Sequence, residues 1–309
     1  MAHRKQSKFI LYLEYIPFFL LYKFVRLLPL HAAYSSSSAL FRLFFVIDRK
    51  HRNRTIQHLM HAKVAPDRKS AVTMAKECFR QFSMLLVEIF KGDQLMRPDS
   101  VRIVGNRELA AKCGAYGEDK RIYKNIIIVT AHYGNWEIAG GFWAGFSHTP
   151  MLSVMRSFTN PYVGELILRN RRAPGHELVD KAGGFRAAYK ALRQGKSLAL
   201  LVDQHANHTE GVETVFFGQP CRTHASAALL HLKTGVPLIP EVTRRRDNNF
   251  NFEFVVGDPI EYPPTGDQEK DVKAVTQLIT SRLEKLIAEA PEQWLWAHRR
   301  WLNINRKSR

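Results

Sequence analysis

The first part of the chain has an apolar pattern interrupted by few charges. Two apolar stretches, Phe9 to Leu30 and Ala39 to Ile47, precede a basic block at residues 48–54. The first is about as long as one transmembrane helix, although three charged residues and a proline interrupt it. Basic residues directly after apolar helices keep that flank cytoplasmic and attract anionic head groups. We therefore expect residues 1–50 to anchor the chain, either spanning a bilayer or lying in its interface. The alternative is two buried core helices of a soluble protein.

The rest of the chain changes from a helical pattern to an alternating one. Residues 56–91 carry apolar side chains at helical spacing, and short apolar runs alternate with helical stretches after Pro98. The expected strands are Val101–Val104, Ile126–Thr130, Leu152–Met155, Leu198–Val202, Leu238–Val242 and Phe252–Val256. The expected helices are Glu137–Phe146, Tyr162–Asn170, Phe185–Leu192, Ala225–Lys233 and Glu269–Glu289.

This alternation predicts the fold class. Strands that alternate with helices form a sheet covered on both faces. The continuously apolar run from Ile126 to Val129 is typical of a buried strand. We predict an α/β fold in which residues 51–309 form one domain, with a mostly parallel or mixed sheet flanked by helices, behind an N-terminal apolar helical membrane anchor.

The charge balance narrows the classes of partner. The chain has 46 Lys and Arg against 28 Asp and Glu, a net charge of +18. Such a field attracts polyanions: nucleic acid, anionic lipid surfaces, phosphorylated substrates or an acidic protein. No RRM, helix-turn-helix or zinc signature is present, so we do not expect nucleic acid as a partner.

The cysteines argue against a metal site. Cys78, Cys113 and Cys221 are odd in number and far apart, and no CxxC or Cys/His metal spacing occurs. We expect no metal, and a reduced domain that faces the cytosol.

The segment NIIIVTAHYGNWEIAG, residues 125–140, holds the strongest candidate chemistry. A buried strand ends at His132, Gly134 allows a tight turn, and Glu137 lies at the start of a helix. Ligands of open α/β sheets bind at the carboxyl ends of strands, where His132 falls. Five steps of 100° would leave the two side chains about 140° apart on one helix, so His132 must precede the helix. Glu137 could then hold the imidazole in the tautomer that leaves its other nitrogen free as a base.

The pair alone is a weak signal. A buried histidine at a strand end and a glutamate favoured by the helix dipole would give the same pattern. Further polar groups follow downstream: LLVDQH (200–205) ends a second buried strand, and FFGQP (216–220) predicts an aromatic loop. The segment PEQWLWAHRRW (291–301) would either meet an anionic surface or pack its aromatic rings on the core.

Taken together, these motifs resemble the lipid A biosynthesis acyltransferases, the lauroyl and myristoyl transferases of Gram-negative bacteria. That family belongs to the lysophospholipid acyltransferase-like superfamily, which is marked by an H-x4-D/E motif. The resemblance covers nearly the whole chain: the apolar start, HYGNWE, Arg156 with Asn160-Pro161, LLVDQ, FFGQP and PEQWLWAHRRW. The loop His205-Ala206-Asn207-His208 departs from the family's best-known members and leaves the acceptor open.

The resemblance implies roles for individual residues. His132 and Glu137 match the catalytic histidine and its acidic partner, Arg171 the functionally important arginine, and Asp203 the later aspartate. Arg169 and Arg172 lie close to the arginine position. We expect Arg156, together with Asn135 and Gln204, to contact substrate. Arg156 and Arg171 could equally be solvated surface arginines.

The implied reaction is acyl transfer from a thioester to a hydroxyl of a lipid A precursor, without a cofactor. His132 would act as general base, and backbone N–H groups near Gly134 or a nearby arginine would stabilise the oxyanion. The donor would be acyl carrier protein or acyl-CoA. The reaction would take place at the cytoplasmic face of the bacterial inner membrane. Alternatives are an acceptor that is a lysophospholipid or another glycolipid, and a membrane-associated thioesterase. No GxSxG nucleophile elbow is present.

Overall fold

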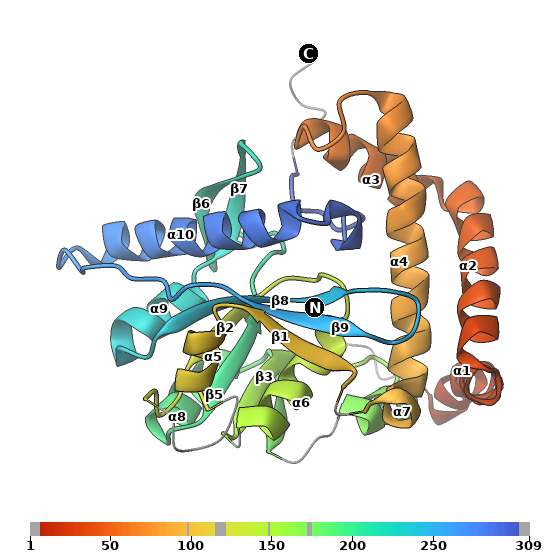
Figure 1. The fold of residues 1–309 in the computed structure, drawn as a ribbon, viewed down its shortest axis with the longest axis horizontal. Helices are drawn as coiled ribbons and strands as arrows, with labels where there is room; N and C mark the ends of the chain where they lie inside the picture. The colour runs from red at the N-terminus through yellow and green to blue at the C-terminus, as the bar shows by residue number, and fades with distance from the viewer. Residues whose placement is uncertain (1–6, 98, 115–121, 148, 172–174, 303–309) are drawn as a thin grey trace.

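The structure is a computed structural model that describes residues 7–97, 99–114, 122–147, 149–171 and 175–302. It has an α/β body at one side of which four long N-terminal helices stand (Figure 1). These helices are α1 (Lys8–Leu27), α2 (Leu30–Ile47), α3 (Arg49–His61) and α4 (Arg68–Leu95).

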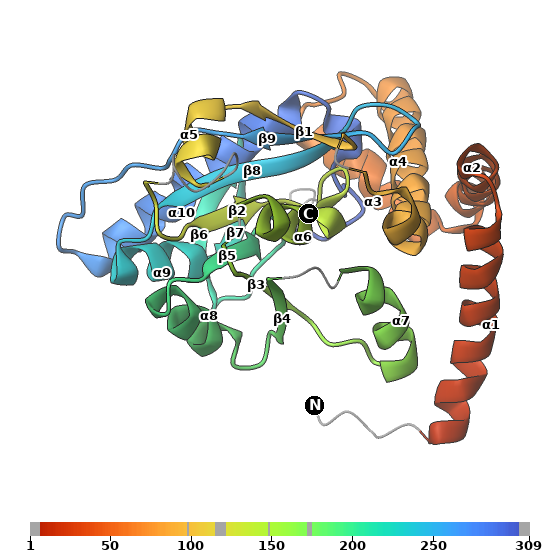
Figure 2. The ribbon, with the colours of Figure 1, turned by 60° about the horizontal axis from the view of Figure 1, so that its bottom comes forward.

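The first two helices run in different directions. Figure 1 shows α2 beside α4, with α1 seen nearly end-on, whereas Figure 2 shows α1 along its length. The break between them falls at Leu28-Pro29, because proline forces an extended conformation on the residue before it.

Both helices bury one side against the rest of the chain. From α1, Tyr22 packs with Phe90 of α4 and Leu166 of α7. From α2, Ala33 and Tyr34 pack with α4. Residues 1–50 as a separate anchor therefore stay a prediction, although α2 is the one described helix long and apolar enough to cross a membrane.

The main sheet contains seven described strands in the order β1-β9-β8-β2-β5-β3-β4. Its strands are β1 (Val101–Gly105), β2 (Ile127–Thr130), β3 (Met151–Met155), β4 (His176–Asp180), β5 (Ser197–Leu201), β8 (Leu238–Arg245) and β9 (Phe252–Val256). Neighbouring strands are parallel except β8 and β9, which are antiparallel. The prediction of a mixed sheet in an α/β fold is confirmed.

Helices cover both faces of the sheet, as the pattern predicted. The helices of the body are α5 (Arg107–Lys112), α6 (Trp136–Ser147), α7 (Pro161–Arg171), α8 (Gly184–Arg193), α9 (Ser226–Thr234) and α10 (Gln268–Ala288). The even side chains of β2, such as Ile128, pack with Trp143 of α6, and the odd ones, such as Val129, pack with α8, α9 and α10. This division explains why β2 is apolar at every position.

Three strands are absent from the prediction. One is the edge strand β4, and the other two are β6 (Gly211–Phe216) and β7 (Gln219–His224), which pair as a hairpin. The predicted aromatic loop at Phe216 to Pro220 is wrong in its extent. Only Phe217 and Gly218 form the turn, both with positive φ as tight two-residue hairpins require, while their neighbours belong to strands.

Candidate active site

The turn between β2 and α6 places His132 and Glu137 as the spacing predicted. His132 follows the end of β2, and Glu137 lies in the first turn of α6. The turn needs a glycine because Gly134 has a φ of 54°. A Cβ at this position would lie against the carbonyl oxygen of Thr243, far inside van der Waals contact.

Two distant segments hold this turn through its backbone. Asn135 donates its N–H to Thr243 of β8 at 3.0 Å. Gly134 donates to the carbonyl of Gln293, and the N–H of Leu295 donates to the carbonyl of His132, both at 3.0 Å. The backbone N–H of Gly134, which we expected at an oxyanion, is therefore already bonded to the C-terminal segment.

Asp203 pairs with His132. Its Oδ1 lies 2.8 Å from His132 Nδ1, and its Oδ2 accepts the backbone N–H of His132 at 2.9 Å. Oδ2 also accepts the indole N–H of Trp294 at 2.7 Å. An ionised carboxylate only accepts hydrogen bonds, so Nδ1 carries the proton and Nε2 keeps its lone pair.

The electrostatics reflect the close contact of the two side chains. Burial raises the pKa of Asp203, but the charge of His132 and the donated hydrogen bonds outweigh it and bring that pKa to about 2. Burial lowers the pKa of His132, but the charges of Asp203 and, to a smaller extent, Glu137 raise it above its usual 6.5. The pKa of His132 is therefore set by two opposing effects, of which the neighbouring negative charges are the stronger.

The carboxylate that orients the imidazole is the main difference from the prediction. Asp203, and not Glu137, bonds Nδ1, because β5 lies directly beside β2 and brings Asp203 to the same edge of the sheet. Glu137 acts on the ring through its charge. Gln204 lies against the ring, with its amide nitrogen 3.1 Å from His132 Nε2 and 3.5 Å from Nδ1.

Asn135 takes a supporting position instead of the expected place at a substrate. Its side chain is fully buried and donates to Glu88 of α4 at 2.9 Å. Its amide oxygen accepts the backbone N–H of Glu137 at 3.2 Å, at the start of α6. Asn135 therefore fixes the turn from behind.

The two predicted arginines differ in what can be said of them. Arg156 follows β3 and lines the same cavity as His132 and Glu137. Arg171 is the last residue of α7, but its side chain and residues 172–174 lie outside the described residues.

A polar cavity of about 640 Å³ contains His132. Its wall includes Glu137, Arg156 and Gln204, along with His205 of the loop that departs from the family pattern. Lys181 and Glu210, 3.1 Å apart, form part of the same wall. The cavity offers hydrogen-bond donors and acceptors next to the free nitrogen of His132.

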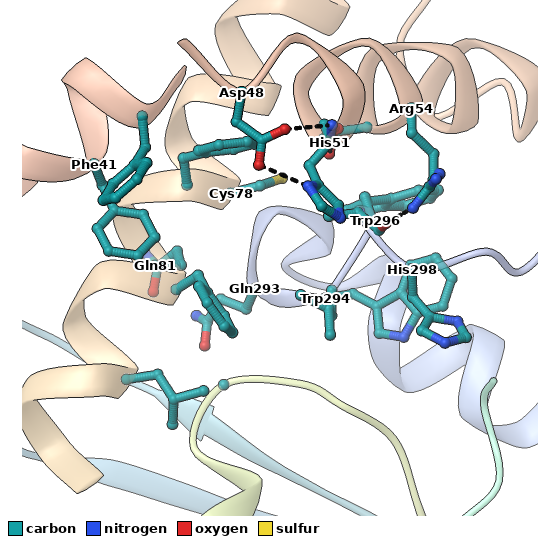
Figure 3. A pocket seen from close by; sticks show the side chains of 18 of the residues that line it. Phe41, Asp48, His51, Arg54, Cys78, Gln81, Gln293, Trp294, Trp296 and His298 are labelled. Atoms are coloured by element: carbon teal, nitrogen blue, oxygen red, sulfur yellow. Dashed lines mark hydrogen bonds and ion pairs between the residues drawn. The ribbon is translucent and has the colours of Figure 1, made fainter. Parts of the chain in front are cut away.

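A second cavity of about 590 Å³ adjoins the first (Figure 3). It shares the lining residues Trp136 and His298 with the polar cavity, so the two cavities are neighbours. Its wall is mainly aromatic and aliphatic and is built by α2, α4 and the C-terminal segment. The apolar lining residues are Phe41, Phe44, Cys78, Phe79, Phe82, Leu85, Trp294, Leu295 and Trp296. Asp48, His51 and Arg54 give it one polar side, where Asp48 and His51 lie 2.6 Å apart.

The C-terminal segment contributes more to the site than the sequence indicated. Trp294, Trp296 and Trp301 are buried in the core, which favours the packing interpretation of the PEQWLWAHRRW motif. Burial lowers the pKa of His298, which lines both cavities, to about 4, so this ring is neutral at physiological pH. Arg300 is buried and donates to the carbonyl of Gln204 at 3.0 Å. The PEQWLWAHRRW motif indicated that this segment matters, but the sequence did not indicate which residues of the site His298 and Arg300 would contact.

No group of three His, Cys, Asp or Glu side chains in the described ranges could hold a metal ion. The three cysteines are free.

Comparison with known proteins finds acyltransferases among the similar sequences. The sequence pattern of a family described as "Bacterial lipid A biosynthesis acyltransferase" matches residues 3–303. The chain is 27% identical over 180 residues to a phosphatidylinositol mannoside acyltransferase of Mycobacterium tuberculosis, covering 57% of this chain and 54% of that protein. It is 25% identical over 179 residues to the lipid A biosynthesis lauroyltransferase of Escherichia coli, covering 58% and 56%. The match thus spans a little over half the length of these relatives.

Proposed function

The chain belongs to the bacterial lipid A biosynthesis acyltransferase family, and we propose that it transfers a fatty acyl chain from a thioester to a hydroxyl of a glycolipid. One observation carries the proposal. His132, backed by Asp203, lines a polar cavity that has an apolar cavity as its neighbour.

In the proposed reaction His132 is the general base. The acceptor hydroxyl displaces the Gln204 amide from Nε2 and gives its proton to that nitrogen as its oxygen attacks the thioester carbonyl. Asp203 stabilises the imidazolium through the Nδ1–H bond, and Glu137 adds a second negative charge. When the intermediate collapses, the C–S bond breaks and the sulfur takes the proton back from Nε2. The products are an ester and a free thiol.

The oxyanion needs a donor other than Gly134, whose N–H is engaged. We assign this role to the Gln204 amide, which the acceptor hydroxyl frees from Nε2. The N–H groups of the amide then lie beside the base and need only rotate toward the reacting carbonyl.

We assign the two substrates to the two cavities. The apolar cavity between α2, α4 and the C-terminal segment suits an acyl chain, because aromatic and aliphatic groups make up most of its surface and the polar groups include one side at Asp48, His51 and Arg54. The polar cavity suits a sugar and its hydroxyl groups. Relatives are named for lipid A and for phosphatidylinositol mannoside, which are both glycolipids, and we favour a lipid A precursor as the acceptor. We favour acyl carrier protein as the donor, because a chain of charge +18 attracts an acidic protein; acyl-CoA is the alternative.

We further propose that the chain works on the cytoplasmic face of the bacterial inner membrane. Large apolar side chains are exposed along the outer sides of α1 and α2: Phe9, Ile10, Leu13, Ile16, Leu20, Leu21, Phe24, Leu27, Leu40, Leu43, Phe44, Val46 and Ile47. A basic run follows at residues 49–54. An apolar surface of this extent beside basic residues suits an anionic bilayer.

The test is acyl transfer by purified chain in mixed micelles. A thioester donor is supplied on acyl carrier protein or on coenzyme A, together with a lipid A precursor or a lysophospholipid, and mass spectrometry records one added acyl group. The wild type should form the ester, and His132→Ala should not, although it folds. Release of free fatty acid without an acylated lipid would mean a thioesterase and would refute the proposal.

A further inference from the structure

A buried ion pair lies behind the turn that joins β2 to α6, and neither of its two residues lines either cavity. Arg245 of β8 donates from Nε and Nη2 to the two carboxylate oxygens of Glu88 of α4, at 2.7 and 2.6 Å. The side chains are 2% and 0% exposed. A charged pair at this depth needs further hydrogen bonds to offset its desolvation.

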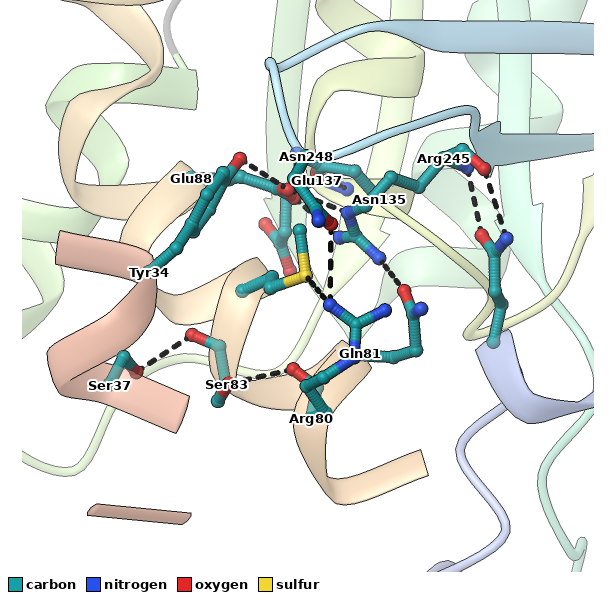
Figure 4. Close-up of polar contacts among 12 residues, drawn as sticks. Tyr34, Ser37, Arg80, Gln81, Ser83, Glu88, Asn135, Glu137, Arg245 and Asn248 are labelled. Carbon is teal, nitrogen blue, oxygen red and sulfur yellow. Dashed lines mark hydrogen bonds and ion pairs between the residues drawn. The ribbon is translucent and has the colours of Figure 1, made fainter. Parts of the chain in front are cut away.

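Those further bonds come from two other segments and from α4 itself (Figure 4). Tyr34 of α2 donates to Glu88 at 3.0 Å, and Asn135 of the turn donates to it at 2.9 Å. The amide oxygen of Gln81, on α4, accepts from Arg245 Nη1. One ion pair thus joins α2, α4, β8 and the turn.

The side-chain network holds the end of the turn near Glu137, and the backbone of Arg245 supports the other end. Near Glu137, the Asn135 side chain bonds Glu88 and also accepts the Glu137 N–H. Near His132, the backbone of Arg245 exchanges two hydrogen bonds with the Gln293 side chain, at 2.8 and 3.0 Å. The carbonyl of Gln293 in turn accepts the N–H of Gly134.

The same helices build the apolar cavity. Phe41 and Phe44 of α2 line it, and so does α4, including Gln81, which is itself a member of the network. Stability alone does not require such a pair, since apolar residues of similar volume often replace a buried ion pair without loss. What apolar residues cannot reproduce is the fixed geometry of the hydrogen bonds to Tyr34, Gln81 and Asn135.

We propose that Glu88 and Arg245 are positioning residues for acyl transfer. They lock the His132–Glu137 turn to the wall of the cavity that takes the acyl chain, so that the thioester carbonyl and the base keep one relative position. The inference rests on the proposed function for its catalytic consequence, but the locking of the turn is independent of it.

The test is the double variant E88L/R245M, which replaces the pair by apolar residues of similar size. The matched control is Arg244→Met, the preceding residue on β8, whose partners are Glu253 and Glu289 and not the turn. Amide hydrogen exchange followed by mass spectrometry is measured for the peptide over residues 131–137 and for peptides of α10, along with thermal unfolding, kcat and KM.

We expect the double variant to fold but to unfold at a lower temperature than the wild type, because Tyr34, Gln81 and Asn135 lose their buried partners. Exchange in the 131–137 peptide should be at least tenfold faster, with α10 unchanged, and kcat should fall at least tenfold with KM for the donor within about threefold. The Arg244→Met control should match the wild type in all of these.

Two outcomes would overturn the inference: unchanged exchange in the turn, or a folded double variant whose kcat stays within twofold of the wild type. If the turn loosens only in the double variant but even the wild type transfers no acyl group, the locking stands and the proposed function fails.

Discussion

Replacing Asp203 by asparagine should abolish catalysis and leave the fold intact. The carboxylate accepts three hydrogen bonds, from His132 N, His132 Nδ1 and Trp294 Nε1. In Asp203→Asn the amide oxygen can stay on Oδ2's two donors, which places the NH₂ group at Nδ1. Because an NH₂ group donates, Nδ1 must become the acceptor and the ring proton moves to Nε2. The nitrogen that faces the acceptor hydroxyl then has no lone pair to take its proton.

The size of the effect differs between catalysis and stability. The equivalent wrong tautomer in a serine protease triad lowers kcat by about 10⁴, or about 5 kcal/mol of transition-state stabilisation. For stability, the pKa of Asp203 falls from 3.8 to about 2 in the fold. At about 1.4 kcal/mol per pKa unit this is on the order of 2 kcal/mol. A carboxylate whose folded pKa lies below its unfolded pKa stabilises the fold fully above pH ~4, and this stabilisation disappears as the pH falls toward 2. At neutral pH the wild type has all of it, so Asp203→Asn loses the full amount.

The assay compares kcat and thermal unfolding of the wild type, Asp203→Asn and a control, Asp180→Asn. Asp180 also ends a strand of the main sheet, but it bonds Ser157 and the Ala182 N–H. A loss of about 2 kcal/mol is smaller than the usual stability of a domain, so the variant should stay folded. The reasoning is refuted if Asp203→Asn keeps more than a tenth of the wild-type kcat.

Three further predictions follow from the site. Because a base must be neutral and the pKa of His132 is raised, kcat/KM should rise with pH through a midpoint above 6.5. Glu137→Gln removes one of the charges that raise this pKa and should move the midpoint to lower pH. An unmoved midpoint in the pH–rate profile would argue against the charge role of Glu137. Gly134→Ala should lower the free energy of unfolding by about 1–3 kcal/mol and kcat at least a hundredfold, because the added Cβ meets the Thr243 carbonyl at a positive φ. Gly145→Ala on α6 is the control, because its Cβ meets nothing within 4 Å. In the apolar cavity, Phe82→Trp should shift donor preference toward shorter acyl chains and Phe82→Ala toward longer ones. Each shift should be about tenfold in a competition between chain lengths. If the wild type and both variants show the same preference, this cavity is not the acyl site.

The sequence predicted what depends on local pattern. The continuous apolar run before His132 and the helix after Gly134 follow from the residues themselves, so β2, the turn and α6 agree with expectation. Strand β4 escaped because it is a half-exposed edge strand whose pattern is only partly apolar. The β6–β7 hairpin escaped because β7, Gln-Pro-Cys-Arg-Thr-His, is largely polar and contains a proline, and because the turn, Phe217-Gly218, lacks the usual Asn-Gly signal.

The partners inside the site were beyond the reach of local pattern. Asp203 and His132 each end a strand, but that β5 lies beside β2 is a property of the sheet order. Asn135 looks available beside His132 in the sequence, yet α4 brings Glu88 against it. For the same reason no pattern could indicate that Trp294 returns to bond Asp203.

That return of the C-terminal segment has a consequence for how the molecule comes into being. During synthesis, the N-terminal helices leave the ribosome first, and Asp203 emerges 91 residues before the tryptophan that completes its hydrogen bonds. The backbone clamp on the turn, from Gln293 and Leu295, arrives equally late. A nascent chain therefore has the turn without its C-terminal clamp and an apolar cavity that lacks one wall. If the proposed transfer needs both, the chain stays inactive until residue 296 has left the ribosome, so the order of synthesis itself keeps an incomplete chain from acting.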